Sequence, residues 1–310
     1  MAEIGVVIVT FNRLEKLKNS LAAFDKETVL PKYILIVNNA STDGTGEWLK
    51  EWLKDKKPYR KYVLTSPKNL GGSGGFYMGL KRASELDADW IWVSDDDVYP
   101  CPTALETGVR YIDKLDTEDS RLAAVASKVV TGGKIDKMHR RHINQTWLYA
   151  KEHYCEEEEY DSEYFEIDIL SYAGSIISRK AIKEVGLPEK NFFIWFDDSE
   201  HSMRLRKYGK LYCVPALEIE HDVEQEYGGK NVTWKDYYGL RNELIMFKRH
   251  YPKRTFVIKV IKKLIRTTGM YLKKDTRIRA TLFYAAIRDG VAGRMGVHPV
   301  YRPGWKAPEK

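Results

Sequence analysis

Ile4-Gly5-Val6-Val7-Ile8-Val9-Thr10-Phe11 is a nearly continuous run of β-branched residues close to the start of the chain. Such a run is typical of a strand buried on both faces in a parallel sheet. Helix-like periodicity follows at 14–21, and the pattern then repeats, with strands expected at 33–37, 62–64 and 90–93 and helices at 46–54 and 75–86. This alternation predicts an α/β fold with a mostly parallel central sheet and right-handed crossovers.

Polar side chains follow the ends of these predicted strands. They are Thr10, Asn12, Asn38, Asn39, Ser41, Asp43, Asn69 and Asp95 to Asp97. Because ligands of open α/β sheets bind outside the carboxyl ends of the strands, we expect these residues to converge on one crevice. The convergence favours a nucleotide pocket.

Trp92-Val93-Ser94-Asp95-Asp96-Asp97-Val98 ends an apolar strand in three consecutive carboxylates. Three such charges repel one another unless a cation or many hydrogen-bond donors lie between them. Oxygen ligands of this kind suit a divalent metal ion. The strand end is therefore a candidate metal site.

The stretch from Asn69 to Phe76 contains Gly71, Gly72, Gly74 and Gly75. Small residues allow a ligand to approach the backbone, and the N-terminus of the following helix can bind a phosphate. The glycine spacing matches neither the dinucleotide fingerprint nor the P-loop. A flexible strand-to-helix turn is the alternative interpretation.

A second acidic group, Asp197-Asp198-Ser199-Glu200, follows the aromatic run from Phe192 to Phe196 and opens a helical pattern. Carboxylates are stabilised in the first turn of a helix, which is a purely structural explanation. An aspartate among aromatic rings is also partly desolvated, which makes it a better base. Trp195 is expected either to stack on a sugar or to belong to the core.

Further along, the predicted strand at 214–220 leads to His221. A neutral imidazole beside two carboxylates forms a mixed site that suits manganese and also admits magnesium. The polar segment 132–161 contains His139, His142 and His153, whose spacing fits no common metal site. We interpret this segment as a surface excursion with solvated histidines.

The composition indicates a soluble globular protein: 310 residues, 43% hydrophobic and 31% charged. Neither a membrane-spanning stretch nor a secretion signal is expected. Cys101, Cys155 and Cys213 lack redox or metal spacing and are interpreted as reduced thiols. These observations predict a cytoplasmic location.

The basic residues gather in the C-terminal part of the chain. From Lys248 to Lys310 there are 17 Lys and Arg and 3 Asp and Glu, a net charge of +14 within an overall charge of +7. Two explanations stand side by side: an ordinary solvated face of a helical pair, or peripheral contact with an anionic membrane at the inner face of the cell membrane. No nucleic-acid motif accompanies the charge, so no nucleic acid is expected.

Taken together, the motifs resemble those of the inverting family 2 glycosyltransferases, and within them the bacterial galactofuranosyltransferases. The resemblance covers most of the chain. It includes Val9 to Arg13, Val37 to Thr45, Asn69 to Phe76, the DXD-type Asp95-Asp96-Asp97, Trp195 to Glu200, His221 and the helix Trp234 to Glu243. It implies the GT-A fold, a Rossmann-like and mostly parallel sheet flanked by helices. It places a catalytic domain at 1–223 and a basic helical region at 224–310.

The resemblance also implies roles for individual residues. Asp198 would be the catalytic base, and Trp195, Asp197 and Glu200 would bind the acceptor. Asp95, Asp97 and His221 would hold Mn²⁺ or Mg²⁺. The donor would be bound by Thr10, Phe11, Asn12, Arg13, Asn38, Asn39, Asp43, Asn69, Gly71, Gly72, Gly74, Asp95 and Asp96.

The implied reaction is transfer of galactofuranose from UDP-galactofuranose to a hydroxyl of a bacterial surface glycan, which could be lipid-linked. Many relatives carry aspartate where Asn38 stands. The asparagine carbonyl can also accept the uracil N3–H, so uridine fits and thymidine is not ruled out. Alternative donors are dTDP-rhamnose and a UDP-hexopyranose. The other classes considered are a metal-dependent nucleotidyltransferase, a glycoside hydrolase and a non-catalytic carbohydrate-binding protein.

Overall fold

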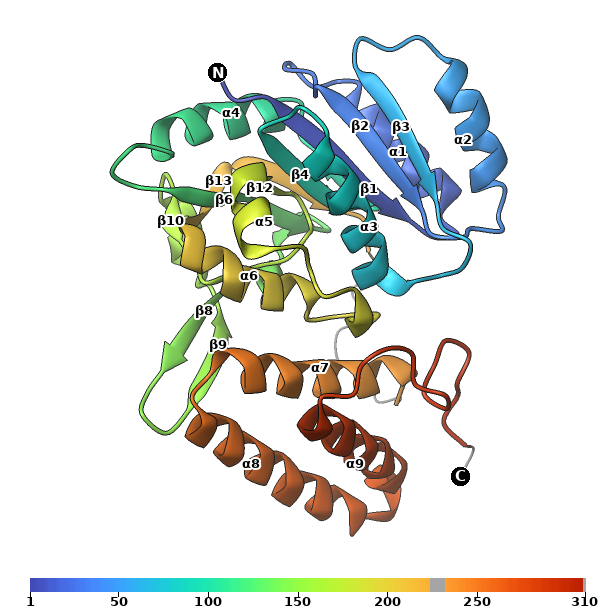
Figure 1. The fold of residues 1–310 in the computed structure, drawn as a ribbon, viewed down its shortest axis with the longest axis vertical. Coiled ribbons are helices and arrows are strands. Elements are labelled where there is room, and N and C mark those ends of the chain that lie inside the picture. The colour runs from blue at the N-terminus through green and yellow to red at the C-terminus, as the bar shows by residue number, and fades with distance from the viewer. Residues whose placement is uncertain (224–231, 309–310) are drawn as a thin grey trace.

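A computed structural model describes residues 1–223 and 232–308. Within these residues, the main sheet has ten strands, eight of which follow the order β10-β13-β6-β12-β4-β1-β2-β3. Strands β1 to β4 are parallel to one another, as the alternation predicts. Strand β12 is antiparallel to both of its neighbours, so the sheet is mixed. Figure 1 shows this sheet flanked by helices.

The strands of the main sheet are β1 (Ile4–Thr10), β2 (Tyr33–Asn38), β3 (Arg60–Thr65), β4 (Trp90–Asp95), β5 (Val98–Pro100), β6 (Leu122–Thr131), β7 (Lys134–Ile135), β10 (Phe165–Glu166), β12 (Ser175–Ser178) and β13 (Lys210–His221). The helices packed around it are α1 (Leu14–Phe24), α2 (Thr45–Lys54), α3 (Gly71–Glu85), α4 (Ala104–Leu115), α5 (Arg179–Val185) and α6 (Asp197–Tyr208). Short 3-10 helices occupy Lys137–His139, Glu157–Asp161, Lys190–Phe192 and Lys274–Thr276.

The register of the parallel strands brings their polar ends together. Thr10 lies beside Asn38, and Val9 lies beside Asp95. All seven residues of β1 are buried, which explains why its sequence is apolar up to Thr10. The predicted crevice therefore lies where β1, β2 and β4 end.

Most of the glycine-rich stretch is helical, since α3 begins at Gly71 and not at position 75 as the pattern predicts. Its glycines allow α3 to pack closely on β1, in addition to letting a ligand approach the backbone. A Cβ on Gly75 would lie 2.6 Å from Val9 Cγ1, and one on Gly79 would lie 2.5 Å from Val7 Cγ1. The absence of side chains lets α3 lie directly on β1.

Segment 132–161 is more ordered than a surface excursion. Strands β8 (Arg140–Gln145) and β9 (Ala150–Tyr154) form a hairpin, and β11 (Ile169–Leu170) completes a three-stranded sheet. Arg140 is fully buried and donates hydrogen bonds to the backbone oxygens of Ser127 and Ala173. Long-range contacts of this kind leave no periodic pattern in the sequence.

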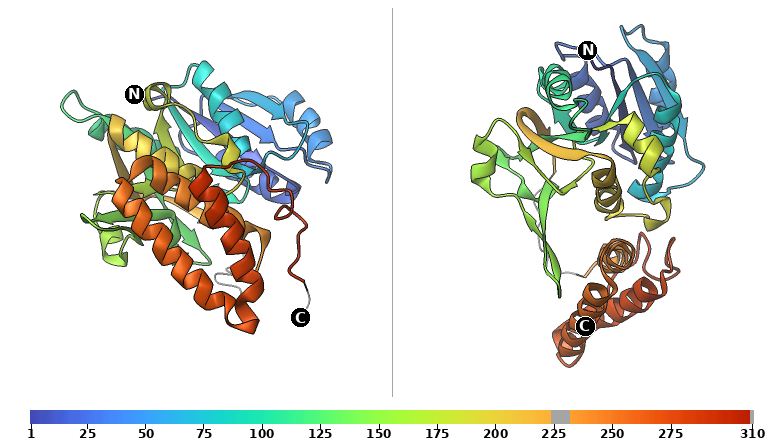
Figure 2. Two further views of the ribbon diagram at one scale, coloured as in Figure 1. Left: turned by 60° about the horizontal axis from the view of Figure 1, so that its bottom comes forward. Right: turned by 60° about the vertical axis from the view of Figure 1, so that its left-hand side comes forward.

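The C-terminal region is helical, with α7 (Trp234–His250), α8 (Lys253–Tyr271) and α9 (Arg277–Ala292). Figures 1 and 2 show α7 between the sheet unit and the pair formed by α8 and α9. The proposed boundary at 223/224 stays a prediction, and residues 224–231 lie outside the described residues.

None of the helices in the described ranges combines the length and the hydropathy that a membrane span requires.

Candidate functional site

One cavity of about 530 Å³ opens at the carboxyl ends of β1 and β4. Its walls come from the strand ends, the first turn of α3, the segment before α6 and the start of α7. The residues that line it include Thr10, Phe11, Arg13, Asn39, Asn69, Gly71, Gly72, Asp95, Asp96, Asp97, Trp195, Asp197, Asp198, His221, Trp234 and Lys235. Both acidic groups of the sequence therefore face the same space.

Five of the predicted site residues do not line this cavity. Asn12 accepts a hydrogen bond from Thr42 N, Asn38 from Ser41 N, and Asp43 from Leu14 N and Thr45 N. These three side chains fix the turns that follow β1 and β2. The other two are Gly74, which packs against Leu70, and Glu200.

Of the three carboxylates that end and follow β4, Asp96 and Asp97 pair with one guanidinium. Arg13 Nη1 lies 2.5 Å from Asp97 Oδ2 and 3.3 Å from Asp96 Oδ1. Burial raises the pKa of Asp96 to about 6, and burial together with the Asp97 and Asp96 charges raises the pKa of Asp95 well above its usual range. The cluster thus carries more acidic groups than Arg13 neutralises.

Asp97 behaves differently from its neighbours. Burial alone would raise its pKa, but His221 and the positive charge of Arg13 outweigh burial and lower it. Asp97 Oδ1 is buried, has no hydrogen-bond partner among the residues that the structure describes, and lies 3.6 Å from His221 Nε2. Two neighbouring ligands on one octahedral metal ion are about 3 Å apart. The 3.6 Å between the Asp97 oxygen and the His221 nitrogen is close to that distance, so the two atoms fit a divalent cation.

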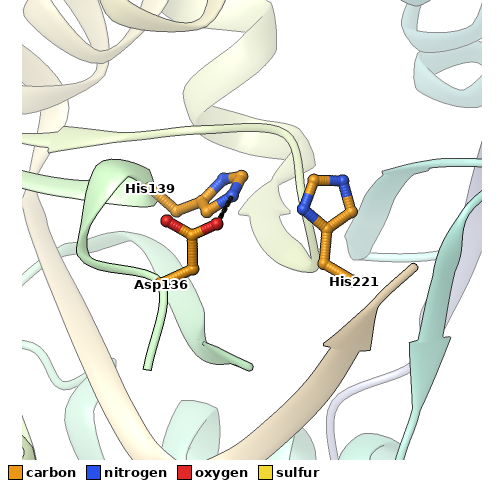
Figure 3. A group of neighbouring side chains, drawn as sticks. All are labelled: Asp136, His139 and His221. Carbon is orange, nitrogen blue, oxygen red and sulfur yellow. Dashed lines mark ion pairs between the residues drawn. The ribbon is translucent and has the colours of Figure 1, made fainter. Parts of the chain in front are cut away.

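A second pair of side chains, absent from the sequence-based site, lies beside His221. His139 Nε2 is 3.5 Å from Asp136 Oδ2, and its Nδ1 is 2.7 Å from Ser171 Oγ. The rings of His139 and His221 meet edge to face with their centroids 5.0 Å apart (Figure 3). Ligand atoms of Asp136, His139 and His221 lie within 4.8 Å of one another.

The prediction that His139 is a solvated surface residue is therefore wrong. Burial lowers its pKa, so that it is neutral near pH 7. His221 Nδ1 is buried and has no hydrogen-bond partner within the described ranges 1–223 and 232–308. Figure 3 shows one ring nitrogen of His221 facing Asp136 and His139. No sequence signal links positions 139 and 221, because only the pairing of β6 with β7 and β13 brings them together.

The second acidic group lies at the N-terminus of α6. Burial and the adjacent Asp198 raise the pKa of Asp197 to about 7. Asp198 is only half-buried, and its Oδ1 accepts hydrogen bonds from Ser199 N and Ser199 Oγ. Trp195 is 47% exposed and lines the cavity, so it is not a core tryptophan.

A strained backbone presents these carboxylates. Phe193, Trp195 and Phe196 adopt φ values of 69°, 64° and 70°. Bulky residues rarely adopt this left-handed conformation, which costs roughly 1–3 kcal/mol each. The fully buried Asn242 of α7 stabilises the segment, since its Nδ2 donates to the backbone oxygens of Phe192, Ile194 and Trp195 at 2.9–3.0 Å.

Asn242→Ala is expected to lower kcat by about 100-fold, because small displacements of reacting groups have effects of this size. Steady-state kinetics below the melting temperature would measure this, with the exposed Asn144→Ala as the matched control. An Asn242→Ala variant with a lower melting temperature and unchanged kcat would show that the contact is only structural.

Glu200 points away from the cavity, although the resemblance places it with the acceptor. Its Oε1 lies 2.8 Å from His250 Nε2, and Arg204 Nη2 lies 2.8 Å from Oε2. Burial alone would raise its pKa, but these two partners lower it to about 2. An ion pair that links α6 to α7 explains its position.

The Glu200 ion pair predicts a pH-dependent stability. Because the folded-state pKa of about 2 lies below the ordinary 4.5, the stabilisation is present above about pH 4.5 and is lost as the pH falls toward 2. It amounts to about 3 kcal/mol. Calorimetry should show Glu200→Gln melting well below the parent at pH 7, with the gap narrowing below pH 4.5. The exposed Glu51→Gln should leave the melting temperature unchanged. A gap that is constant with pH would contradict this account.

A sequence model described as Glycosyl transferase family 2 matches residues 5–186, which is more than half of the chain. The chain belongs to glycosyltransferase family 2. The family resemblance carried by the motifs is confirmed.

Galactofuranosyltransferases are among the relatives of this family 2 member, as the resemblance predicts. GlfT1 of Mycolicibacterium smegmatis is 28% identical over 217 residues, which is 68% of each chain. GlfT1 of Mycobacterium tuberculosis is 38% identical over 91 residues, a match that spans only 29% of the length of each. The dTDP-rhamnosyl transferase RfbF of Shigella flexneri is 26% identical over 311 residues, or 95% of this chain and 97% of RfbF.

Solved structures confirm the predicted GT-A fold with its C-terminal helices. GalNAc-T7 with UDP, GalNAc and Mn²⁺ superposes with a TM-score of 0.63 at 18% identity, over 80% of this chain and 48% of that one. The mannosyltransferase PcManGT of Pyrobaculum calidifontis, with GDP-Man and Mn²⁺, gives 0.56 at 12% identity, over 94% and 86%.

Proposed function

We propose that the protein transfers a sugar, galactofuranose from UDP-galactofuranose, to a hydroxyl of a bacterial surface glycan with inversion at the anomeric carbon. One observation carries the proposal: two separate acidic groups, one beside a histidine and one on a helix N-terminus, line a single cavity. The known relatives of the family that act on galactofuranose support the choice of sugar.

The first acidic group forms the donor side. Asp95, Asp97 and His221 would hold Mn²⁺ or Mg²⁺, and the metal ion would stabilise charge on the departing diphosphate. Solved neighbours that contain Mn²⁺ with a nucleotide or nucleotide-sugar support this assignment. Arg13 and Lys235, which line the same cavity, are cations that a diphosphate could contact.

The second acidic group forms the acceptor side. Asp198, the more accessible carboxylate, would take the proton from the acceptor hydroxyl while that oxygen attacks the anomeric carbon. Attack from the face opposite the diphosphate inverts the configuration. Asp197 and Trp195 would orient the acceptor, the first by hydrogen bonds and the second by stacking. Glu200 is no longer included, because it faces α7.

Asp136 and His139 are proposed to position His221, because Asp136 pairs with His139 and the His139 ring packs edge to face against the His221 ring. Partners of this kind typically change metal affinity by about 10–100-fold. Asp136→Asn is therefore expected to weaken Mn²⁺ binding at least about tenfold. Titration followed by electron paramagnetic resonance would measure this without any turnover. The exposed Asp161→Asn is the control. Equal Mn²⁺ affinity in both variants would contradict the role.

A panel of nucleotide-sugars, assayed with and without EDTA in the presence of glycan acceptors, tests the proposed reaction. We expect release of UDP from UDP-galactofuranose that stops when EDTA removes the metal. Release of pyrophosphate would indicate a nucleotidyltransferase instead, and free sugar without an acceptor product would indicate hydrolysis.

A second donor, dTDP-rhamnose, belongs in the same panel. The RfbF match extends over 97% of that protein, further than the GlfT1 matches do. The resemblance assigns the side-chain carbonyl of Asn38 to the nucleobase of the donor. In the structure this carbonyl accepts a hydrogen bond from Ser41 N. If the protein prefers dTDP-rhamnose, it is still a glycosyltransferase, but the transferred sugar is rhamnose and not galactofuranose.

A further inference from the structure

The outer face of α8 carries apolar side chains that nothing in the described chain covers. Val257, Ile261, Leu264 and Ile265 are 43%, 50%, 38% and 68% exposed, and Leu272 directly after the helix is 76% exposed. Their spacing of three, four and seven residues places them along one face of a helix. Surface helices of globular proteins normally turn such a stripe toward the core.

The tip of the β8–β9 hairpin extends this face. Trp147, Leu148 and Tyr149 are 68%, 49% and 46% exposed. The tip contacts α8 through Arg254, whose Nε donates to Trp147 O and whose guanidinium lies 4.9 Å from the Trp147 ring. Lys262 Nζ lies 6.0 Å from the Tyr149 ring. The hairpin and the lower helices are side by side in Figures 1 and 2.

Positive charge surrounds the apolar stripe. Between Lys253 and Lys274 there are eight Lys and Arg residues and no Asp or Glu. Lys259 and Lys263 face inward and pair with Glu243. The exposed basic side chains are Lys253, Arg254, Lys262, Arg266, Lys273 and Lys274.

We propose that this surface, the outer face of α8 with the tip of the β8–β9 hairpin, docks on an anionic lipid bilayer. Aliphatic side chains would enter the interface while the surrounding basic residues contact anionic headgroups. Tryptophan and tyrosine, which are enriched where bilayers meet water, stand at its edge. An anionic bilayer is the occupant that satisfies both the stripe and its charges.

A second copy of the chain fits this surface less well. Symmetric pairing of two such faces would bring two sets of exposed basic residues together without any acidic partner on the stripe. A nucleic acid or an acidic protein would meet the charges but would leave the aliphatic stripe unmatched. Docking requires no donor or acceptor, so it goes beyond the proposed transfer reaction. It would also bring the cavity to any acceptor carried on a lipid.

Vesicle flotation of the full chain tests the proposal. We expect binding to vesicles of phosphatidylcholine with phosphatidylglycerol, and at least tenfold weaker binding to phosphatidylcholine alone. Ile261→Asp with Ile265→Asp should abolish binding. Lys262→Glu with Arg266→Glu should weaken it by about 100-fold or more, because each basic residue near the membrane contributes about fivefold in affinity and charge reversal replaces that attraction with a repulsion of similar size.

The matched control is Lys50→Glu with Lys56→Glu, two exposed basic residues in and beside α2 of the sheet unit. This variant should bind vesicles like the parent. Circular dichroism and the melting temperature would verify that every variant is folded. We expect them to fold because the substituted residues are exposed. Transfer to a water-soluble acceptor should be unchanged in all of them, so failure to dock is distinguishable from failure of the reaction.

Two results would overturn the proposal. One is the absence of binding to anionic vesicles at low salt. The other is sedimentation of the parent as a dimer that Ile261→Asp with Ile265→Asp converts to a monomer, since the face would then be an interface between copies.

Discussion

Asp198→Asn is expected to lower kcat by about 10²–10⁴-fold while UDP binding stays within a few-fold of the parent, because general-base catalysis has effects of this size. The substitution keeps the shape of the side chain and an oxygen that can still accept from Ser199 N. It removes only the carboxylate that is proposed to accept the proton. Single-turnover kinetics, with isothermal titration of UDP, would separate the two quantities.

Asp197→Asn is the matched comparison for Asp198→Asn. The pKa of Asp197 is raised to about 7 by burial and by Asp198, so near neutral pH this side chain already carries a proton part of the time. The neutral amide resembles that protonated form. We therefore expect a smaller loss of kcat than for Asp198→Asn. The reverse order would assign the base to Asp197.

Asp97→Ala is expected to reduce kcat/KM by roughly 10³-fold, since a metal ion supplies several kcal/mol of charge stabilisation. Asp97 is the member of the triple aspartate whose pKa is lowered, and its Oδ1 lies 3.6 Å from His221 Nε2. Its removal should abolish tight Mn²⁺ binding measured by equilibrium dialysis.

The control for Asp97→Ala is Asp161→Ala on the surface, which should bind Mn²⁺ like the parent. An Asp97→Ala variant that binds Mn²⁺ normally and turns over at the parent rate would refute the donor side of the mechanism. A variant that binds Mn²⁺ normally but turns over slowly would show that residues other than Asp97 bind the metal ion.

Local patterns predicted the central sheet well. The β-branched run at 4–10 forms β1, and each of the first four strands occurs where the alternation predicts it. Such strands are recognisable because burial on both faces demands apolar residues throughout. The ends of parallel strands must then meet at one edge, so Thr10, Asn39 and Asp95 to Asp97 could be assigned to one cavity from the sequence.

The sequence was least informative where long-range contacts decide which way a side chain faces. Glu200 follows Asp198 by two residues, but the helical turn of α6 directs it toward His250 and Arg204. His139 reaches His221 only through the folding of β6, β7 and β13, across 82 positions of sequence. Asn242 holds a segment nearly fifty residues away. Spacing along the chain carries no information about contacts of this kind.

The proposed reaction requires one cavity to hold a metal ion and a nucleotide on one wall and an acceptor on the other. The most direct test is an anomalous difference map from crystals soaked with UDP and Mn²⁺. We predict a manganese peak within about 2.5 Å of the Asp97 carboxylate and His221 Nε2, with the UDP diphosphate beside it and Asp198 facing the same cavity. A manganese peak outside this cavity, or UDP bound elsewhere on the molecule, would contradict the account.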